Sequence, residues 1–369
     1  MERRQRIPVG VLGATGAVGQ RFVQLLIGHP WFELAEVAGS ARTAGRPYGE
    51  VAGWRLPGGV PEEARDLVVR GPDDELTSPI LFSALPAEVA GETEERLARA
   101  GHAVFSNARS HRMAPDVPLI VPEVNADHAA VLDRQRGERG WSGSLVTNPN
   151  CSTIHLVLAL KPLQDAFGLD RVLATTLQAV SGAGYPGVPS LDMIDNVVPY
   201  IGGEEEKIES ESRKILGGYD PTDGFAEAGL VLSATCTRVP VRDGHTESVS
   251  VGLRRPAELA EVADALRAFA GQPQELGLPS APRQPVIVLD EPDRPQPVLD
   301  RDRERGMATV VGRLRPCPIL GYKFVLLGHN TIRGAAGASI LNAELLLAQG
   351  HLANVELGSA TRLRVQSVE

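Results

Sequence analysis

The sequence predicts a two-domain α/β protein, and three observations support this prediction. Short apolar runs alternate with helical patterns over residues 1–149, as in a parallel sheet with helical crossovers. Strand patterns separated by turns follow over residues 150–330 and indicate a mixed α+β domain. A final apolar helix is expected at residues 335–348, and we expect the segment 331–369 to return to the first domain. A chain of 369 residues is long enough for two such domains.

The composition is that of a soluble globular protein, with 43% apolar and 22% charged residues. A net charge of −9 argues against a broad nucleic-acid surface. The N-terminal segment lacks the apolar core of a signal peptide, and no apolar run approaches membrane-spanning length. Cys151, Cys236 and Cys317 are widely separated and odd in number, so we expect neither a disulfide framework nor a metal site. These features predict a reduced, cytoplasmic protein that binds neither nucleic acid nor membrane.

A glycine-rich turn follows the first predicted strand. The apolar run at residues 7–12 leads into Gly13-Ala-Thr-Gly-Ala-Val-Gly19, and a helix through Phe22, Leu25 and Leu26 comes next. Strand, glycine turn and helix in this order are the context of a Rossmann-type turn, where free helix N–H groups bind the pyrophosphate of a dinucleotide. The spacing GxxGxxG is less specific than GxGxxG, and a structural glycine turn is the alternative. The predicted cofactor contacts here are Gly13, Thr15, Gly16, Ala17, Val18 and Gly19.

The second predicted strand, residues 34–38, indicates which dinucleotide the domain binds. It ends in Gly39-Ser40-Ala41-Arg42-Thr43, and sites for NAD usually place an Asp or Glu near this point for the ribose 2′-hydroxyl. None occurs here, whereas Ser40, Arg42 and Thr43 could receive a 2′-phosphate. We therefore predict NADP as the cofactor. For Arg42 taken alone, an ordinary exposed arginine is the alternative.

Further strands and helices continue the parallel pattern. Strands are predicted at residues 80–84 and 102–105, with a helix between them at 87–100. The second strand leads into Ser106-Asn-Ala-Arg-Ser-His-Arg-Met113, and arginines in such a loop tend to face the ligand crevice of a parallel sheet. The pattern continues through residues 119–125. Residues 133–143 are charged and contain glycine, so a surface excursion is expected there.

Cys151 lies where an extended segment meets a helix. Pro149 keeps the preceding chain extended, and Ser152 and Thr153 suit a first helical turn. The helix dipole should lower the pKa of a thiol at this position, and free N–H groups of the first turn could stabilise an oxyanion. The alternative is a small buried thiol. Asn150 either lies beside the thiolate or caps the helix.

The second domain is predicted from strand patterns and one charged helix. Strands are expected at residues 172–180, 286–289, 307–314 and 322–327. Residues 230–241 and 247–253 are expected to pair as antiparallel neighbours around the turn 242–245. The helix at 203–216 carries many charges, most of which we expect to be solvated. A further helix is predicted from residue 259 to 269, and the proline-rich segment 279–297 is predicted to be mostly loop.

Taken together, the motifs resemble those of one enzyme family. They lie in order over residues 7–345 and comprise Gly13-Ala-Thr-Gly-Ala-Val-Gly19, Ser106-Asn-Ala-Arg-Ser-His-Arg112, Val121-Pro-Glu-Val-Asn125, Asn148-Pro-Asn-Cys-Ser-Thr153, Gln178-Ala-Val-Ser-Gly-Ala-Gly-Tyr185, the Glu205/Lys207 helix, Arg238-Val-Pro-Val-Arg-Asp-Gly-His245 and Asn330-Thr-Ile-Arg-Gly334. The sequence resembles the aspartate-β-semialdehyde dehydrogenases, and their archaeal and fungal branch more than the common bacterial one. The resemblance implies NADPH-dependent reductive dephosphorylation of aspartyl-4-phosphate to aspartate semialdehyde and phosphate, in lysine, threonine and methionine biosynthesis. It also implies a homodimer or homotetramer.

The resemblance implies roles for the residues at the reacting centre. Cys151 matches the nucleophile, because a thioester accepts hydride where a carboxylate cannot. His245 matches the acid–base group, and Gln178 matches the residue that orients the intermediate. Three positions resemble contacts to the nicotinamide half of the cofactor: Ser181, Gly182 and Asn330.

The substrate carries a phosphate, an α-carboxylate and an α-ammonium group, so its site needs cations and one carboxylate. By resemblance, Arg238 would bind the α-carboxylate in a bidentate pair. Arg112 and Lys207 would bind the phosphate, and Glu205 the ammonium group. Glu204 and Glu206 could exchange roles with Glu205, and Arg109 is a weaker rival to Arg112.

Related reductases and a non-catalytic role are the alternatives. N-acetylglutamyl-phosphate reductases would show Asn-Pro-Gly-Cys-Tyr around the nucleophile and glyceraldehyde-phosphate dehydrogenases Ser-Cys-Thr-Thr-Asn, and neither occurs here. A malonyl-CoA reductase shares the motifs of this branch closely, so substrate assays are needed to separate it. A non-catalytic paralogue would be expected to lose the Cys, Gln, Arg or His positions, and all four are present.

Overall fold

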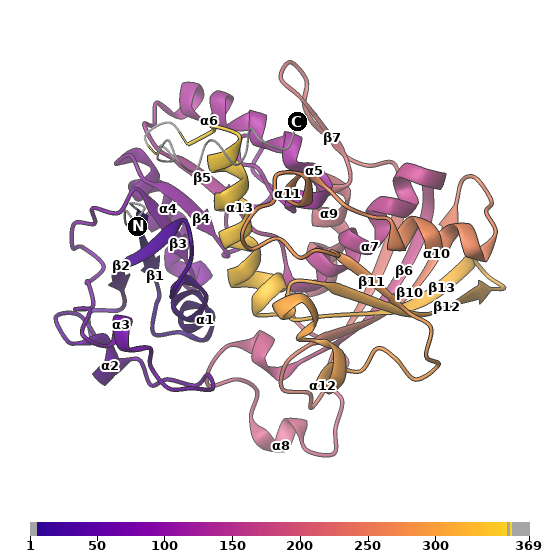
Figure 1. Ribbon diagram of the computed structural model, residues 1–369, viewed down its shortest axis with the longest axis horizontal. Coiled ribbons are helices and arrows are strands. Elements are labelled where there is room, and N and C mark those ends of the chain that lie inside the picture. Colours follow the sequence, from indigo (N-terminus) through magenta and orange to yellow (C-terminus); the bar gives the residue numbers. More distant parts are fainter. Residues whose placement is uncertain (1–5, 353–354, 356–369) are drawn as a thin grey trace.

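The first domain is built on a five-stranded parallel sheet (Figure 1). The computed structural model describes residues 6–352 and residue 355. Residues 1–5, 353–354 and 356–369 lie outside the described residues, so the predicted segment 331–369 is described only in part. The strands are β1 (Ile7–Leu12), β2 (Phe32–Ala38), β3 (Ile80–Ser83), β4 (Ala103–Ser106) and β5 (Ser144–Thr147), in the spatial order β2-β1-β3-β4-β5. All neighbouring pairs are parallel, so the carboxyl ends of the strands meet at one edge. The predicted parallel sheet is confirmed.

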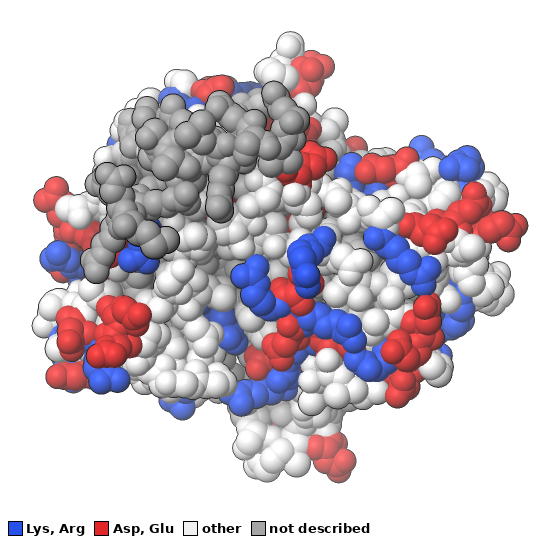
Figure 2. All heavy atoms as spheres, in the orientation of Figure 1, with Lys and Arg blue, Asp and Glu red and all other residues white. Residues whose placement is uncertain are grey.

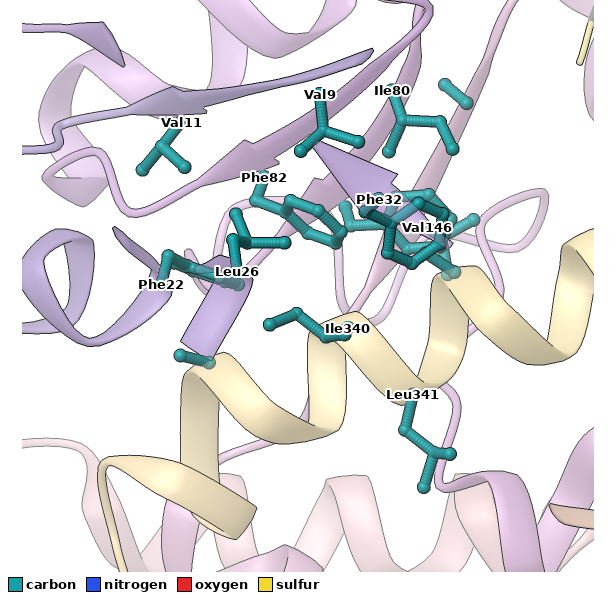
Figure 3. Packing of buried hydrophobic residues seen from close by; sticks show 14 of the residues in the cluster. Val9, Val11, Phe22, Leu26, Phe32, Ile80, Phe82, Val146, Ile340 and Leu341 are labelled. Carbon is teal, nitrogen blue, oxygen red and sulfur yellow. The ribbon is translucent and has the colours of Figure 1, made fainter. Parts of the chain in front are cut away.

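Helices cover both faces of this sheet. The helix α1 (Ala17–Leu26) and the C-terminal helix α13 (Gly337–Ala348) pack on one face, and α4 (Ala87–Arg99) packs on the other. A π-helical turn, η4 (Ile332–Ala336), leads into α13. In Figure 3, Ile340 of α13 points toward Phe22, Leu26 and Phe82 beneath the sheet. Burial of each such side chain stabilises the fold by about 1.5–3 kcal/mol, and the predicted return of the C-terminal helix is confirmed.

The segment 133–143, expected to be a surface excursion, lies mostly at the surface, but its first part is helical. Residues up to Arg139 belong to helix α6 (Val131–Arg139), which ends at Gly140 with a φ of 64°. Gln135 of this helix is buried; its Nε2 donates to the carbonyl of Leu145, and its Oε1 accepts from the Leu145 N–H. Gln135 thereby satisfies the backbone of Leu145 at the edge of β5, a contact that composition alone does not reveal.

The second domain is built on a six-stranded mixed sheet. Its strands are β6 (Leu169–Gln178), β9 (Val231–Arg238), β10 (His245–Leu253), β11 (Val286–Leu289), β12 (Thr309–Cys317) and β13 (Gly321–Gly328), in the order β11-β12-β13-β10-β6-β9. The expected antiparallel pairing of residues 230–241 with 247–253 is wrong, because β6 lies between β9 and β10. β9 pairs with β6 in parallel, and the helix α9 (Glu204–Ile215) forms part of the crossover between them.

The helices α7 (Cys151–Phe167), α9 and α10 (Leu259–Arg267) pack against the second sheet, and the charges of α9 are more buried than predicted. The expectation that the charges of α9 are solvated is wrong for Glu204, Glu211 and Lys214, which are all buried. The Nζ of Lys214 donates to the carbonyls of Arg112, Ala114 and Val117. One face of α9 therefore fastens the arginine-bearing loop of the first domain to the second.

The connecting segments are short. They are α2 (Tyr48–Val51), α3 (Glu62–Arg65), α5 (Pro122–Asn125), η1 (Ala126–Ala130), η2 (Val180–Ala183), α8 (Ser190–Met193), the hairpin of β7 (Gly218–Asp220) and β8 (Gly224–Ala226), α11 (Gln272–Glu275), α12 (Pro297–Asp300) and η3 (Arg303–Gly306). Among the described residues, no helix combines the length and the apolar character needed to cross a membrane. On the face drawn in Figure 2, acidic and basic side chains are interspersed.

Candidate active site

Cys151 is the first residue of α7, and Asn150 caps this helix. The Oδ1 of Asn150 accepts hydrogen bonds from the N–H groups of Ser152 at 2.9 Å and Thr153 at 3.3 Å. The capping alternative for Asn150 is thus what the structure displays. The expectation of free first-turn N–H groups is wrong for Ser152 and Thr153, because the cap already satisfies both. The Asn150 side chain does not bond the N–H of Cys151, so this amide is the one that the cap leaves for an oxyanion.

His245 lies directly beside the thiol. Its Nε2 is 3.1 Å from the Sγ of Cys151, and its Nδ1 accepts a hydrogen bond from the N–H of Ala179 at 3.0 Å. A ring nitrogen that accepts carries no hydrogen, so the neutral ring holds its hydrogen on Nε2 and directs it at the sulfur. Burial, with help from Arg238 and His329, lowers the pKa of His245 to about 3. His245 is therefore a neutral hydrogen-bond donor in this site.

The expected lowering of the Cys151 pKa is wrong for the free site. Burial raises the pKa of this thiol to about 12, and the carboxylate of Glu204 acts in the same direction. Arg112 and Arg238 act against it and favour the thiolate, but they do not outweigh desolvation. The sequence indicates the position of Cys151 at a helix N-terminus but not its desolvation. The resting pair is accordingly a thiol beside a neutral imidazole.

Gln178 and Arg238 meet at the ends of two neighbouring strands. They are register partners on β6 and β9, and the Nη1 of Arg238 donates to the carbonyl of Ala179 at 2.9 Å. The Nε2 of Gln178 lies 3.3 Å from the Oε2 of Glu204. A Cβ on Gly182 would lie 2.9 Å from the Nη1 of Arg238 and 3.1 Å from the Cε1 of His245. Glycine at position 182 therefore lets the turn η2 (Val180–Ala183) lie close to the side chains of Arg238 and His245.

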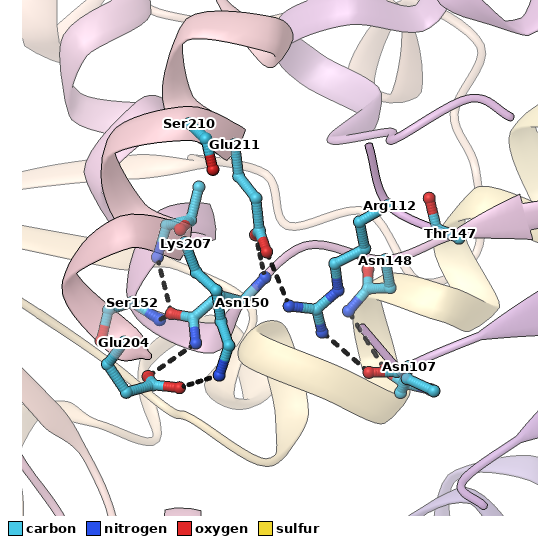
Figure 4. A network of polar contacts seen from close by, with 12 residues as sticks. Asn107, Arg112, Thr147, Asn148, Asn150, Ser152, Glu204, Lys207, Ser210 and Glu211 are labelled. Atoms are coloured by element: carbon cyan, nitrogen blue, oxygen red, sulfur yellow. Dashed lines mark hydrogen bonds and ion pairs between the residues drawn. The ribbon is translucent and has the colours of Figure 1, made fainter. Parts of the chain in front are cut away.

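The carboxylate of Glu204 faces the candidate site (Figure 4). Its Oε2 accepts from the Nδ2 of Asn150 at 2.7 Å, and its Oε1 pairs with the Nζ of Lys207 at 2.6 Å. Glu205 instead accepts a hydrogen bond from the backbone N–H of Cys236 on β9. Of these two glutamates, Glu204 is therefore the one whose carboxylate lies beside Asn150 and Gln178, whereas Glu205 is turned toward β9. Glu206 is exposed.

Arg112 is the arginine of its loop that points inward. It is buried, and its Nη1 pairs with the Oε1 of Glu211 at 2.9 Å, whereas Arg109 is exposed. Glu211 was not singled out from the sequence, although a signal for it exists. Residues 204, 207, 211 and 214 are spaced at three, four and three, so they share one face of α9. All four side chains on this face make polar contacts that join the two domains or the site residues.

The glycine-rich turn has the geometry that a pyrophosphate requires. Gly13 has a φ of 70°, and a Cβ on Gly19 would lie 2.1 Å from the carbonyl oxygen of Gly13. Gly16 is the N-cap of α1 and has no side chain to bond the first-turn N–H groups, so those of Ala17 and Val18 are left for an anion. Thr15 precedes this cap and is partly buried. The residues of the turn thus fit a dinucleotide.

The end of β2 fits a phosphorylated ribose. Ser40 and Arg42 are exposed there, and the Thr43 hydroxyl donates to the carbonyl of Ser40. The nearby carboxylate, Glu36, accepts hydrogen bonds from Ser78 and Thr77 and is occupied within the fold. Arg70 was missed from the sequence; it is exposed, and its backbone bridges to Ala38 at this same edge. Only pairing between distant segments brings it there.

Ser181, one of the three residues predicted to contact the nicotinamide half of the cofactor, lines a cleft between the domains, and Asn330 is hydrogen-bonded to Ser181. The Nδ2 of Asn330 donates to the Oγ of Ser181 at 2.8 Å, and its Oδ1 accepts from the N–H of Gly244 at 2.9 Å. A cleft of about 310 Å³ runs from Ala17 on α1 to Ser181. No cluster of side chains suited to a metal ion occurs within the described part of the chain.

Two domain families match this chain over most of its length. The NAD binding domain of the semialdehyde dehydrogenases matches residues 8–132, and their dimerisation domain matches residues 160–333. The aspartate-semialdehyde dehydrogenase of Methanothermobacter thermautotrophicus is 54% identical over 345 residues, which cover 92% of this chain and 99% of that protein. This chain belongs to the aspartate-semialdehyde dehydrogenase family.

A fungal member of the aspartate-semialdehyde dehydrogenase family and a solved structure agree with this. The aspartate-semialdehyde dehydrogenase of Cryptococcus neoformans is 49% identical over 362 residues, which cover 95% of this chain and 99% of that protein. The crystal structure of the Candida albicans aspartate semialdehyde dehydrogenase with NADP has a TM-score of 0.87 at 45% identity, covering 94% of this chain and 100% of that chain. The predicted family and its α/β fold with a dinucleotide-binding first domain are confirmed, and the predicted cofactor agrees with the NADP in the Candida albicans structure.

Proposed function

We propose that this chain reduces aspartyl-4-phosphate with NADPH to aspartate semialdehyde and phosphate through a thioester on Cys151. The observation that carries the proposal is the 3.1 Å contact between the Sγ of Cys151 and the Nε2 of His245 at the N-terminus of a helix. A nucleophile that meets a hydrogen-bond donor beside a buried arginine and a buried glutamine is the arrangement that acyl transfer requires.

The charges around Cys151 complement those of the substrate. Arg238 would bind the α-carboxylate and Glu204 the α-ammonium group, since burial leaves each of them able to form a strong charge-assisted contact. Arg112 and Lys207 would bind the phosphate. Burial raises the pKa of Glu204, but the charge and hydrogen bond of Lys207, together with hydrogen bonds from Asn150 and Gln178, outweigh burial and lower it, so Glu204 is ionised when an ammonium group arrives.

In the acylation step, the Cys151 sulfur bonds to the acyl carbon, the carbon–oxygen bond to phosphate breaks, and the thiol proton ends on the departing phosphate. In the reduction step, NADPH supplies the hydride. The resulting alkoxide collapses to the aldehyde and the free sulfur, and a proton from solvent restores the thiol. Because the Nδ1 of His245 accepts from the N–H of Ala179, His245 would act here by hydrogen bonding, and not as the source of the protons that the resemblance implies. Its Nε2–H would stabilise charge first on the oxygen and then on the sulfur, an interaction of about 1.5–3 kcal/mol when one partner is charged.

The cofactor would lie along the carboxyl edge of the first sheet. We assign the pyrophosphate to the turn Gly13, Thr15, Gly16, Ala17, Val18 and Gly19, and the 2′-phosphate to Ser40, Arg42 and Thr43. Ser181, Gly182 and Asn330 would contact the nicotinamide half, and the lack of a side chain on Gly182 lets this turn lie close to Arg238 and His245.

The test is phosphate-dependent reduction of NADP by the purified protein given aspartate semialdehyde. Succinic semialdehyde with phosphate, and malonic semialdehyde with CoA, are run in parallel. Strict dependence on phosphate and on the amino-acid aldehyde is the expected result, and activity only with CoA and malonic semialdehyde would replace the proposed substrate. Cys151→Ser should abolish turnover while NADP binding and the melting temperature stay unchanged; the matched control is Cys317→Ser, at a buried thiol of β12.

We further propose that the protein is a homodimer formed through the outer face of the second sheet. Leu173 and Leu177 of β6 and Val231 of β9 are exposed on strands whose alternate residues are buried. The segment that follows β6 has further exposed apolar side chains, at Leu191, Ile194, Val197 and Tyr200. An apolar sheet face of this kind usually meets a partner. Leu173→Glu should shift the mass measured by light scattering toward the monomer, and an unchanged mass would place the interface elsewhere.

A cytoplasmic location is also proposed. Cys151, Cys236 and Cys317 are free thiols, which suits a reducing compartment. Fractionation of the source cells is the direct measurement.

A further inference from the structure

Glu211 is a buried carboxylate that connects two parts of the proposed site (Figure 4). Its side chain projects from the middle of α9 and is 2% exposed. Its Oε1 accepts a hydrogen bond from the Nη1 of Arg112 at 2.9 Å, and its Oε2 accepts from the backbone N–H of Asn150 at 2.6 Å. One carboxylate therefore joins the proposed phosphate-binding arginine to the residue directly before the nucleophile.

The guanidinium of Arg112 is held on both terminal nitrogens. Besides the Nη1 contact with Glu211, its Nη2 donates to the carbonyl of Asn107 at 2.8 Å. An arginine has five N–H donors, so these two bonds fix the guanidinium plane and leave one further N–H on each terminal nitrogen for an anion. The Nε–H is buried and has no partner among the described residues. A phosphate, with several acceptor oxygens, matches this set.

The other oxygen of Glu211 acts on the nucleophile segment. Asn150 accepts from the first-turn amides of α7 with its side chain and donates its own backbone N–H to Glu211. Both ends of this residue are thus fixed, and Cys151 follows it directly. If the carboxylate were lost, Arg112 would become a buried charge with one contact fewer, and the Asn150 amide would lose its acceptor.

We propose that Glu211 is a positioning residue for the phosphate step, holding Arg112 and the backbone before Cys151 in fixed relation. The inference rests on the proposed function, since it takes Arg112 as a phosphate-binding residue. Glu211 acts through Arg112 and through the Asn150 backbone, and it does not touch the substrate. Because Arg112 is the proposed phosphate-binding partner, removal of the carboxylate should weaken phosphate binding selectively and leave the binding of the aldehyde and of NADP intact.

The experiment compares Glu211→Gln with Glu209→Gln in the direction of aldehyde oxidation, where phosphate is a substrate. Glu209 is the matched control, because it lies on the same helix and accepts a hydrogen bond from the N–H of Ala234, away from Arg112. In Glu211→Gln we expect KM for phosphate to rise about tenfold, and KM for the aldehyde and NADP to stay within about twofold. Glu209→Gln should leave all three constants unchanged.

Two further variants separate positioning from folding. Glu211→Asp keeps the charge, so it should fold and raise KM for phosphate less than the amide does. In an Arg112→Met background, Glu211→Gln should have no further effect on KM for phosphate, because the two residues act as one unit.

Three results would overturn the inference: an unchanged or lower KM for phosphate in Glu211→Gln, an equal rise in all three constants, or additive effects in the double variant. Wild-type protein without phosphate-dependent activity would overturn the proposed function and this inference with it. An active wild type with an unselective Glu211→Gln would overturn the inference alone.

Discussion

The neutral state of Cys151 and His245 predicts how the free thiol reacts with an alkylating reagent as the pH is changed. Burial raises the pKa of Cys151 to about 12 and lowers that of His245 to about 3, so both shifts favour the uncharged forms. At pH 8 a thiol with such a pKa is ionised to roughly one part in ten thousand, whereas an ordinary thiol with a pKa of about 8.5 is roughly one-quarter ionised. A thiolate–imidazolium pair would instead be ionised throughout the neutral range.

The assay is the rate of alkylation of Cys151 by iodoacetamide between pH 6 and pH 9, without substrate, followed by mass spectrometry of the Cys151 peptide. We expect the rate to rise about tenfold per pH unit with no plateau, because the thiolate fraction rises by that factor. Cys236 and Cys317 are buried and serve as internal controls for unfolding. A rate that is already high and independent of pH below pH 7 would refute the neutral pair. It would also show that the helix N-terminus and the nearby arginines outweigh burial.

Three substitutions test other features of the molecule. Glu247→Gln should raise the free energy of unfolding at pH 8 more than at pH 5 in urea titrations. Burial raises the pKa of the Glu247 carboxyl, which has no hydrogen-bond partner among the described residues. As the pH rises above its ordinary pKa near 4.5, the carboxyl ionises in the unfolded chain before it does in the folded protein, so the free energy of unfolding falls. An equal effect of the substitution at both pH values would contradict this. Gly182→Ala should lower kcat/KM at least about tenfold with little change in melting temperature, because its Cβ would lie 2.9 Å from Arg238 and 3.1 Å from His245; unchanged kinetics would show that the turn relaxes freely. Arg42→Ala should raise KM for NADP about tenfold and leave KM for NAD unchanged, and parallel changes would remove Arg42 from the 2′-phosphate site.

Local sequence patterns were sufficient for the first domain. The order of strand, glycine turn and helix from residue 7 to 26 depends on neighbours in the chain, and the structure has it as predicted. Helix α4 likewise begins at Ala87, as its periodicity indicates. These elements could be predicted because each hydrophobic period and each turn glycine is set within about ten residues.

Features that depend on distant partners could not be predicted in the same way. A turn at residues 242–245 suggests a hairpin, yet β6 enters between the two strands because its pairing is decided by residues some sixty positions away. The acidic residues of α9 look alike in sequence, but Glu204 meets Asn150 whereas Glu205 meets the backbone of β9. The pKa of Cys151 depends on how deeply the whole site is buried, which a motif does not report.

The most direct test of the central claim is to look for the acyl group on Cys151. The protein is mixed with aspartyl-4-phosphate without NADPH, quenched in acid, digested and examined by mass spectrometry. We expect an aspartyl adduct on the Cys151 peptide that NADPH removes before the quench and that Cys151→Ser lacks. An adduct on another residue, or none while turnover proceeds, would contradict the thioester mechanism.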